Sequence, residues 1–282
     1  MHHIAKHLED ITANGYTVLP GFFAASWMQR CIDAYPQLSR AQSFAESDAV
    51  WLDNGLERAP NLFLPAAANR GLLDLLEAAM GPFVQLDNLT FYNFPNQPAE
   101  KAGKPSGWHR DIWQVPPQVE GYRPPDAMNA ICYFQDLDDG LGPLRVIPGS
   151  HRRVVADPVG DVPHPDEVLI HAKAGDVILI HCNLYHSGTA NVSGKPRFFW
   201  SAYYNRAWLR TRDNHDGPNA RAIIKRAQDH GDVRVARLLG HDPGLIPRCH
   251  GPDRVANTER WRTWIDEDRA GLRTPSWLPE PA

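Results

Sequence analysis

The segment Trp108-His109-Arg110-Asp111 places an imidazole and a carboxylate two residues apart. In a β-strand, residues i and i+2 project from the same face, so an extended segment would bring His109 and Asp111 side by side. A second imidazole, His186, lies just beyond a predicted buried strand that contains the aliphatic run 177–180. Two imidazoles and one carboxylate from different strands form the facial ligand set typical of non-haem Fe(II), with three coordination positions left open. The sequence therefore predicts that His109, Asp111 and His186 bind iron.

Arg197 begins another β-rich run, 197–204, shortly after His186. Strand alternation places Arg197 on one face with Phe199 and Ser201, and we expect this face to line the interior of a barrel. A guanidinium that faces inward is costly unless it binds an anion, and its planar fork matches a carboxylate. The distal carboxylate of 2-oxoglutarate is the expected partner. Asn93, at the end of a strand that enters the same barrel, is expected to contact the cosubstrate or the substrate.

The elements that must position these side chains are short and β-rich. From Phe83 onward such runs are separated by Gly, Pro, Asn and Asp; they are 83–94, 108–114, 128–135, 144–147, 168–171, 176–182 and 197–205. Short strands that follow one another without intervening helices are typical of a sandwich or barrel, and a double-sheet jelly roll closes them with few open edges. We predict a mainly β fold with flanking helices around a double-stranded β-helix, the cupin-like jelly roll.

Helical patterns flank this β-rich region on both sides. Apolar residues recur at helical spacing in 4–11, 25–38 and 67–80 before it, and helical pattern returns in 219–239 and 257–270 after it. A short strand is predicted at 16–19, and Pro36 is expected to end the second helix early. Because no linker, repeat or low-complexity tract divides the chain, we predict a single domain, 1–282. Its parts are a helical N-terminal support 1–82, a jelly-roll core 83–205 and a helical C-terminal extension 206–282.

The composition excludes several classes of protein. The 282 residues include 33 acidic and 29 basic side chains, for a net charge of −4, so there is no strong basic field to attract nucleic acid or an anionic membrane surface. No apolar run approaches the ~20 residues that span a bilayer, and the N-terminus lacks the apolar stretch of a secretory signal. We expect a cytoplasmic protein, monomer or homodimer, with a small-molecule substrate and no binding to nucleic acid or membrane.

Taken together, the motifs resemble the phytanoyl-CoA dioxygenase family of Fe(II)/2-oxoglutarate oxygenases. The residues that carry this resemblance are Trp108-His109-Arg110-Asp111, Gly142-Pro143-Leu144-Arg145-Val146-Ile147-Pro148-Gly149-Ser150-His151, Ala174-Gly175-Asp176, His186, Asn191 and Arg197. The resemblance implies a double-stranded β-helix in which His109, Asp111 and His186 hold iron. It also implies that Arg197 binds 2-oxoglutarate and that O2 is the second cosubstrate.

The chain departs from the family pattern at two places. Family members often have Gly-Ser after the distal histidine, and that serine helps to hold 2-oxoglutarate. Here the order is His186-Ser187-Gly188-Thr189, so the hydroxyl role passes to Ser187 or Thr189, or is lost. Leu141 stands where an asparagine often precedes Gly-Pro-Leu. The carboxylate ligand Asp111 is retained, which disfavours a halogenase-type site.

The predicted activity is that of a non-haem Fe(II)/2-oxoglutarate-dependent dioxygenase. It would hydroxylate an unactivated C–H bond of a small-molecule metabolite, with release of succinate and CO2. The alternative is a non-catalytic or non-oxidative metal-binding jelly roll of the cupin type, which has no need of an inward arginine at 197. His181 is a less favoured third ligand than His186. The loops 95–107 and 112–127 and the C-terminal helices are expected to shape the substrate pocket, whose ligand the sequence does not specify.

Overall fold

A computed structural model describes residues 2–40, 50–111, 117, 119–249, 257–271 and 277–278. Its strands are β1 (Tyr16–Leu19), β2 (Val50–Leu52), β3 (Val84–Phe94), β4 (Ala127–Tyr133), β5 (Leu144–Val146), β6 (Val168–Ile170), β7 (Val177–His181), β8 (His186–Ser187) and β9 (Arg197–Arg206). Its helices are α1 (His2–Asn14), α2 (Ala25–Ser39), α3 (Gly55–Arg58), α4 (Pro60–Ala67), α5 (Arg70–Met80), α6 (Pro218–Asp229), α7 (Val233–Leu238), α8 (Leu245–Cys249) and α9 (Asn257–Ala270), with a 3₁₀ turn η1 (Ala99–Lys101).

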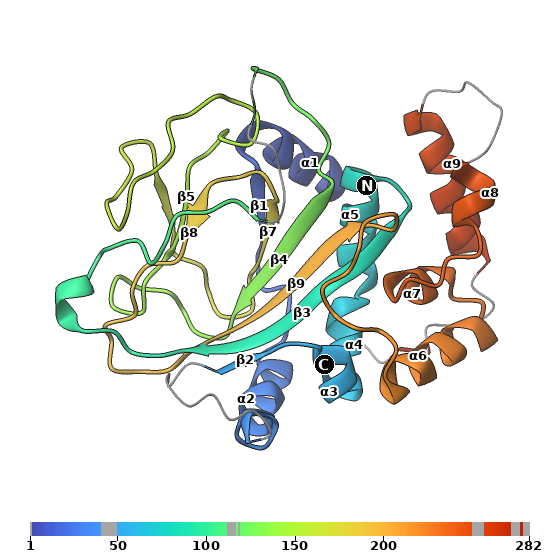
Figure 1. The fold of residues 1–282 in the computed structure, drawn as a ribbon, viewed down its shortest axis with the longest axis horizontal. Coiled ribbons are helices and arrows are strands. Elements are labelled where there is room, and N and C mark those ends of the chain that lie inside the picture. Colours follow the sequence, from blue (N-terminus) through green and yellow to red (C-terminus); the bar gives the residue numbers. More distant parts are fainter. Residues whose placement is uncertain are drawn as a thin grey trace. The chain divides into compact units, whose positions relative to one another are not determined.

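Two sheets form the β structure. The larger has the strand order β1-β7-β4-β9-β3-β2, and Figure 1 shows β4, β9 and β3 running side by side. The smaller has the order β6-β5-β8. All strand pairs for which a register is defined are antiparallel, as between β4 and β7, where Asn129 is opposite Ile180. Antiparallel strands arranged in two sheets are the architecture expected of a jelly roll.

Alternation along the long strands separates two apolar layers. On one face, Phe91 and Phe198 contact Tyr35 of α2 at ring-centroid distances of 5.6 and 5.1 Å. The opposite face of the larger sheet contacts a cluster of buried apolar residues that come from both sheets, and Phe199 packs against this cluster. The buried members of that cluster are Ile131, Tyr133, Leu137, Leu141, Leu144, Val146, Ala172, Ile178, Ile180 and Leu184. The prediction that Arg197 and Phe199 share the inner face of their strand agrees with this arrangement.

Most predicted elements are present, and their boundaries show where local signals were misread. The predicted 67–80 helix corresponds to α5, which begins three residues later at Arg70, because the Asn69 side chain accepts a hydrogen bond from the Leu72 N–H (3.2 Å) and caps the helix there. The predicted 219–239 helix is two helices, since Gly231 has a φ of +67° between α6 and α7. Pro36 does not end α2, which continues to Ser39.

The predicted strand 108–114 is wrong over the residues that the structure describes. His109 makes an isolated β-bridge with His186, and Asp111 lies in a bend. Residues 112–116 and 118, part of the stretch 112–127 that is expected to shape the pocket, lie outside the described residues. The short elements β2, α3, η1, β8 and α8 have no counterpart among the predictions, because elements of two to five residues carry almost no periodicity. The helix α4 was not predicted either, apart from its last residue, Ala67.

The chain divides into two compact units, each described here by itself. The first contains residues 1–52 and 90–201, and the second contains residues 53–89 and 202–282. Both boundaries within the β-rich region fall inside a strand, β3 in one case and β9 in the other. The single domain 1–282, with its three parts, stays a prediction.

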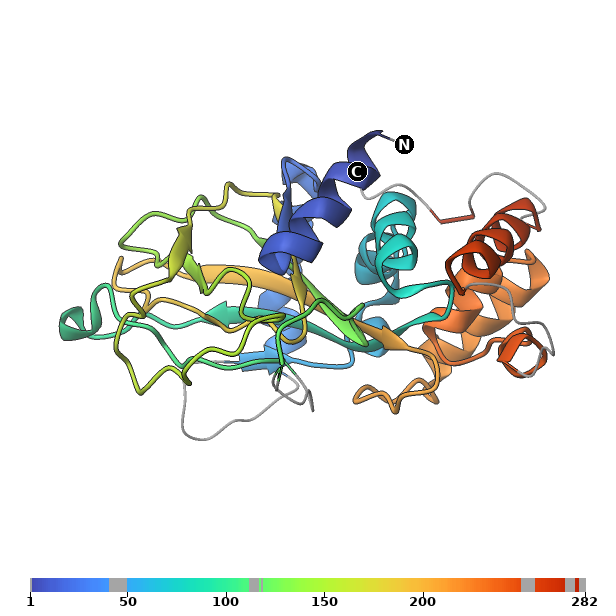
Figure 2. The same cartoon turned by 90° about the horizontal axis from the view of Figure 1, so that it is seen from above.

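The second unit is largely helical, and α6 to α9 form one group (orange to red) in both Figures 1 and 2. Glu57 of α3 accepts a hydrogen bond from the Ala220 N–H (2.9 Å) in the first turn of α6, where a helix presents unpaired N–H groups. Arg234 of α7 binds Asp74 and Glu77 of α5 at 2.7 and 2.8 Å. Within the described residues, no helix is both long enough and apolar enough to cross a membrane.

Candidate active site

His109 and His186 come together through backbone pairing in the first unit. The His109 N–H donates to the His186 carbonyl and the His186 N–H donates to the His109 carbonyl, both at 3.0 Å. β8, which contains His186, also pairs with β5, where Val146 is opposite His186. This reciprocal bridge holds the two imidazole rings with their centroids 4.2 Å apart.

Asp111 completes a cluster of three possible metal ligands. Its Oδ1 lies 3.8 Å from Nε2 of His109 and 3.7 Å from Nε2 of His186. One ligand atom from each residue can be chosen so that all lie within 4.8 Å of one another. Asp111 and His186 are buried, whereas the His109 side chain is 52% exposed, so His109 forms the solvent-facing side of the cluster. The structure therefore brings together all three residues predicted to bind iron.

Hydrogen bonds fix which imidazole nitrogen faces the centre of the cluster. Nδ1 of His109 lies 2.9 Å from the Gly107 carbonyl, and Nδ1 of His186 lies 3.1 Å from the Leu184 carbonyl. Because a carbonyl oxygen only accepts, each Nδ1 carries a proton, and Nε2 is the nitrogen that faces the centre of the cluster. Burial lowers the pKa of His186, although the Asp111 carboxylate opposes this shift. Neutral imidazoles whose second nitrogen is hydrogen-bonded are the usual form of metal-binding histidine, so this donor set fits a first-row divalent metal such as iron.

Arg197 is buried in the first unit, at 2% exposure, and one edge of its guanidinium is unpaired. Nη1 donates to three backbone carbonyls, those of Leu141 (2.6 Å), Gly142 (2.9 Å) and Thr189 (2.7 Å). Nε is buried and has no hydrogen-bond partner among the described residues, which also supply no carboxylate to Arg197. Burial lowers the pKa of Arg197. The Nε–Nη2 edge of a guanidinium is the one that binds a carboxylate through two parallel hydrogen bonds, so this cradle fits an anionic ligand.

Gly142 explains part of the Gly-Pro-Leu motif. Its φ is +86°, a conformation that residues with a Cβ rarely adopt. A Cβ at this position would lie 2.7 Å from Nη1 of Arg197 and 2.5 Å from the Thr189 carbonyl oxygen. Only glycine allows the backbone to approach the guanidinium this closely.

The three polar residues expected to assist Arg197 have other contacts. The Ser187 hydroxyl accepts from the Gly107 N–H (3.1 Å) and donates to the Gly188 carbonyl (2.8 Å). The Thr189 hydroxyl accepts from Nε of Arg145 (2.8 Å), and it is the Thr189 carbonyl that contacts Arg197. Asn93 is on the face of β3 that includes Phe91 and is directed toward α2, whereas Phe94 lies 4.4 Å from the Arg197 guanidinium. The structure therefore places Phe94 beside the guanidinium and Asn93 on the opposite face of β3, and the contact of Asn93 with cosubstrate or substrate stays a prediction.

His181, the less favoured third ligand, belongs to a different cluster. Its Nε2 lies 3.2 Å from the Arg123 carbonyl, and its Nδ1 accepts from the Asn183 N–H at 3.0 Å. The ring lies 4.9 Å from that of His151. Burial is the largest cause that lowers the pKa of His181 to about 4 and that of His151 to about 3. With both nitrogens of His181 occupied, this pair is a neutral part of the core.

Sequence reasoning missed Asn129, which contacts the triad. Nδ2 of Asn129 lies 3.4 Å from Oδ2 of Asp111, and Oδ1 of Asn129 accepts from the Ser201 hydroxyl at 2.8 Å. All three side chains are buried. A usable signal was present, because Asn129 is the only amide in the strand Ala127–Tyr133 and such a group needs a partner when buried.

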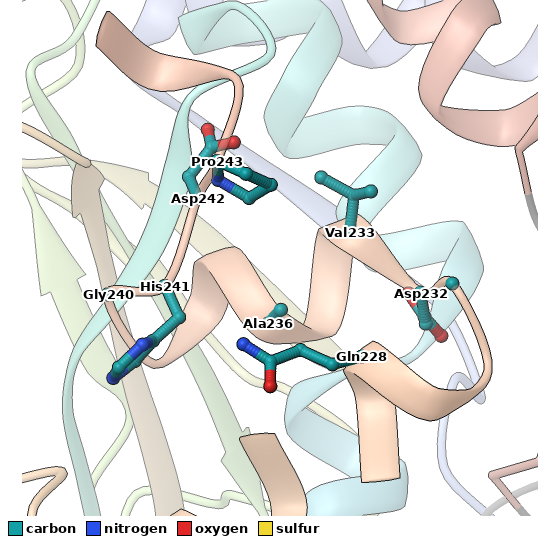
Figure 3. A pocket seen from close by; sticks show the side chains of 9 residues that line it. Gln228, Asp232, Val233, Ala236, Gly240, His241, Asp242 and Pro243 are labelled. Carbon is teal, nitrogen blue, oxygen red and sulfur yellow. The ribbon is translucent and has the colours of Figure 1, made fainter. Parts of the chain in front are cut away.

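A pocket of about 510 Å³ lies in the second unit, at α6, α7 and the loop after them, and Figure 3 shows its lining. Its two carboxylates already have partners. Asp232 accepts from the Val235 N–H and from Trp277 Nε1, both at 3.1 Å, and Asp242 pairs with Arg237. None of the triad residues line it, and its carboxylates stabilise the fold.

Comparison with known sequences supports the interpretation of the motifs. The phytanoyl-CoA dioxygenase (PhyH) family pattern matches residues 11–199. An ectoine dioxygenase of Bordetella parapertussis is 28% identical over 131 residues, which cover 36% of this chain and 41% of that protein. An L-proline trans-4-hydroxylase of Streptomyces griseoviridis is 29% identical over 130 residues, covering 35% of this chain and 47% of that protein. The chain thus matches less than half the length of these two relatives.

Comparison with solved structures concerns the fold. The crystal structure of HygX from Streptomyces hygroscopicus with nickel and 2-oxoglutarate bound superposes with a TM-score of 0.60 at 14% identity, covering 73% of this chain and 88% of that one. This likeness confirms the predicted jelly-roll core with flanking helices. The family pattern covers well over half of the chain, including all three clustered ligands and Arg197. The protein therefore belongs to the phytanoyl-CoA dioxygenase family.

Proposed function

We propose that the protein is an Fe(II)/2-oxoglutarate-dependent dioxygenase that hydroxylates an unactivated C–H bond of a small molecule. The overall reaction consumes the substrate, 2-oxoglutarate and O2 and yields the hydroxylated product, succinate and CO2. One observation carries the proposal: the same unit contains an intact His-Asp-His cluster and a buried arginine whose Nε is unpaired and which has no carboxylate partner among the residues that the structure describes. A metal-binding jelly roll without oxidative chemistry accounts for the cluster and leaves the buried guanidinium unexplained.

The residues then have distinct roles. His109, Asp111 and His186 would hold iron, and Arg197 would bind the distal carboxylate of 2-oxoglutarate through its Nε–Nη2 edge. Bound iron with 2-oxoglutarate and O2 supplies the oxidising power. The protein contributes orientation and the exclusion of water, for which the buried side of the cluster at Asp111 and His186 is suited. The carbonyls of Leu141, Gly142 and Thr189 keep the guanidinium fixed before the ligand arrives.

The substrate would approach from the side of His109, the exposed member of the cluster. The names of the two matched relatives specify ectoine and L-proline, which are small polar metabolites. We infer a small-molecule substrate of comparable size for this chain. A cytoplasmic location and a monomeric or homodimeric state stay predictions.

The test combines turnover with metal binding. Purified protein should release succinate and consume oxygen when given Fe(II) and 2-oxoglutarate, and a metabolite screen should find compounds that stimulate this turnover. In an anaerobic titration, His186→Ala should bind Fe(II) much more weakly than the wild type. His181→Ala is the matched control, because it removes a buried imidazole of the same region and should keep wild-type affinity. Loss of iron in His181→Ala with retention in His186→Ala would show that the wrong histidine was assigned, and metal binding without any 2-oxoglutarate turnover would favour the non-oxidative alternative.

A further inference from the structure

We propose that Asn129, oriented by Ser201, is a positioning residue that determines which oxygen of Asp111 binds the metal. The inference rests on the proposed iron site and adds to it two residues on neighbouring strands, β4 and β9. Neither residue is one of the metal ligands, and neither belongs to the cradle around Arg197.

The two oxygens of Asp111 have different surroundings. Oδ1 is the oxygen that lies 3.8 and 3.7 Å from the Nε2 atoms of His109 and His186. Oδ2 accepts from Nδ2 of Asn129 at 3.4 Å. A carboxylate held in this way offers Oδ1 to a metal at the centre of the cluster while Oδ2 stays bound to the amide. Coordination through one oxygen uses one position, which leaves three open positions for cosubstrate and oxygen.

Ser201 sets the orientation of the amide. Its hydroxyl donates to Oδ1 of Asn129 at 2.8 Å, so the carbonyl end of the amide faces Ser201 and the NH₂ end faces Asp111. A flipped amide would place its carbonyl oxygen against the carboxylate and its NH₂ group against Ser201. Asn129 is 1% exposed and Ser201 is 3% exposed, so water competes little for these groups. The relay Ser201–Asn129–Asp111 therefore has one favoured orientation.

The test measures metal affinity, with no need for a known substrate. Asn129→Leu removes the donor and keeps the branched shape of the side chain, and it should weaken Fe(II) binding to the apoprotein by about 10–100-fold, the usual cost of losing an outer-shell partner of a metal ligand. Ser201→Ala should weaken it less, and Ser201→Thr, which keeps a hydroxyl, should restore affinity toward the wild type. Ile131→Val is the control for altered core packing, because Ile131 lies on the same strand and donates no hydrogen bond from its side chain; it should leave affinity unchanged.

Two further readouts separate positioning from a merely structural role. The double variant Asn129→Leu/Ser201→Ala should bind Fe(II) no more weakly than Asn129→Leu alone, because Ser201 acts through Asn129. The visible spectrum of the Co(II)-loaded protein should change in Asn129→Leu and stay unchanged in Ile131→Val, as expected if the carboxylate binds differently. Additive losses in the double variant would overturn the relay.

The outcomes also distinguish this inference from the proposed function. Wild-type protein that binds neither Fe(II) nor Co(II) would overturn the proposed function and this inference together. Wild-type affinity and an unchanged Co(II) spectrum in folded Asn129→Leu would overturn the inference and leave the iron site intact. Should Asn129→Leu fail to fold, Ser201→Ala compared with Ser201→Thr decides the question by the same titration.

Discussion

Two buried arginines, Arg197 in the first unit and Arg237 in the second, solve the problem of a buried charge in different ways. Arg237 is 1% exposed, and its Nε and Nη2 bind Asp242 and Asp268 at 2.5 and 2.8 Å. Burial alone would lower the pKa of Arg237, but the hydrogen bonds and charges of these two carboxylates raise it. Arg197 is equally inaccessible, yet its contacts are with carbonyls, and burial lowers its pKa.

The difference teaches how a structural arginine can be told from a binding one. A buried guanidinium with two carboxylates is already neutralised, and the group of charges stabilises the fold only as a set. A buried guanidinium that is held by neutral carbonyls, with Nε unpaired, keeps a positive charge that no carboxylate neutralises. Such a charge lowers the stability of the fold until an anionic ligand binds to it, which is expected where a ligand completes the site.

The largest expected effect is on the second unit. Arg237→Leu leaves Asp242 and Asp268 buried with a cation removed, and breaking such a buried pair costs about 3–5 kcal/mol of unfolding free energy. Denaturation with urea measures it. Lys225→Ala, which removes the exposed Lys225–Asp229 pair of α6, is the control and should cost well under 1 kcal/mol. If Arg237→Leu is as stable as the control, the buried and the exposed ion pairs contribute equally to unfolding free energy, and Arg237 is not the structural arginine inferred here.

Arg197→Ala should mainly weaken the binding of 2-oxoglutarate, whereas Arg237→Leu mainly lowers the unfolding free energy. Truncation would leave the distal carboxylate of 2-oxoglutarate without its partner, which costs about 2–5 kcal/mol in binding, so apparent affinity should fall at least about tenfold. Lysine at 197 should restore affinity only in part, because an ammonium group cannot reproduce the fork. Iron affinity should change little. The 2-oxoglutarate dependence of succinate formation measures the effect, and an unchanged dependence would place the cosubstrate elsewhere.

The stability of the Arg197 variant sharpens the contrast. Removing the side chain unpairs three carbonyls but also removes a buried charge, so the two contributions oppose each other. We expect Arg197→Ala to lose less unfolding free energy than Arg237→Leu. It should also lose most of the thermal stabilisation that 2-oxoglutarate gives the wild type, since stabilisation by a ligand follows its affinity.

The clustering of His109, Asp111 and His186 and the type of fold could both be predicted from the sequence, because both depend on signals that are local or strongly periodic. His109, Asp111 and His186 were found by residue type and spacing, although the strand assumed for His109 is only a single bridge. The carbonyl cradle around Arg197 could not be predicted, since it depends on the positive φ of Gly142 and on where the Thr189 carbonyl points. The contact expected of Asn93 stays a prediction, because alternation from Phe91, whose side chain faces α2, places Asn93 on the face of β3 that does not carry Phe94.

Asn129 shows a second kind of limit. Its contacts join residues that are distant in the sequence: the pairing of β4 with β9 brings Ser201 to Asn129, whereas Asp111 comes from a bend outside both strands. A buried amide in an apolar strand indicates that it has some partner, but only the folded structure identifies which residue that is. The same holds for the two carboxylates of Arg237, of which Asp268 lies on α9.

The smallest expected effect concerns two buried histidines, His151 and His181, for which the structure shows no ion pair among the residues it describes. His151 and His181 have pKa values of about 3 and about 4 in the folded protein, against an ordinary value of 6.5. Between pH 6.5 and about pH 4 the unfolded chain therefore binds more protons at these two positions, and unfolding free energy should fall as the pH falls through this window. Each histidine contributes at most about 1.4 kcal/mol per pH unit.

Comparing the wild type with His151→Leu isolates this contribution from that of the carboxylates. Urea denaturation at pH 7, 6 and 5 should give the variant a shallower decline in unfolding free energy, by up to about 1.4 kcal/mol per pH unit. The variant can be less stable at pH 7, because the His151–Thr12 contact is lost, without affecting the slope. Equal slopes would mean that the folded protein protonates this histidine, and that burial without an acidic partner does not exclude its charge. A buried cation would then cost little without a carboxylate partner, and Arg197 would need an anion no more than Arg237 does.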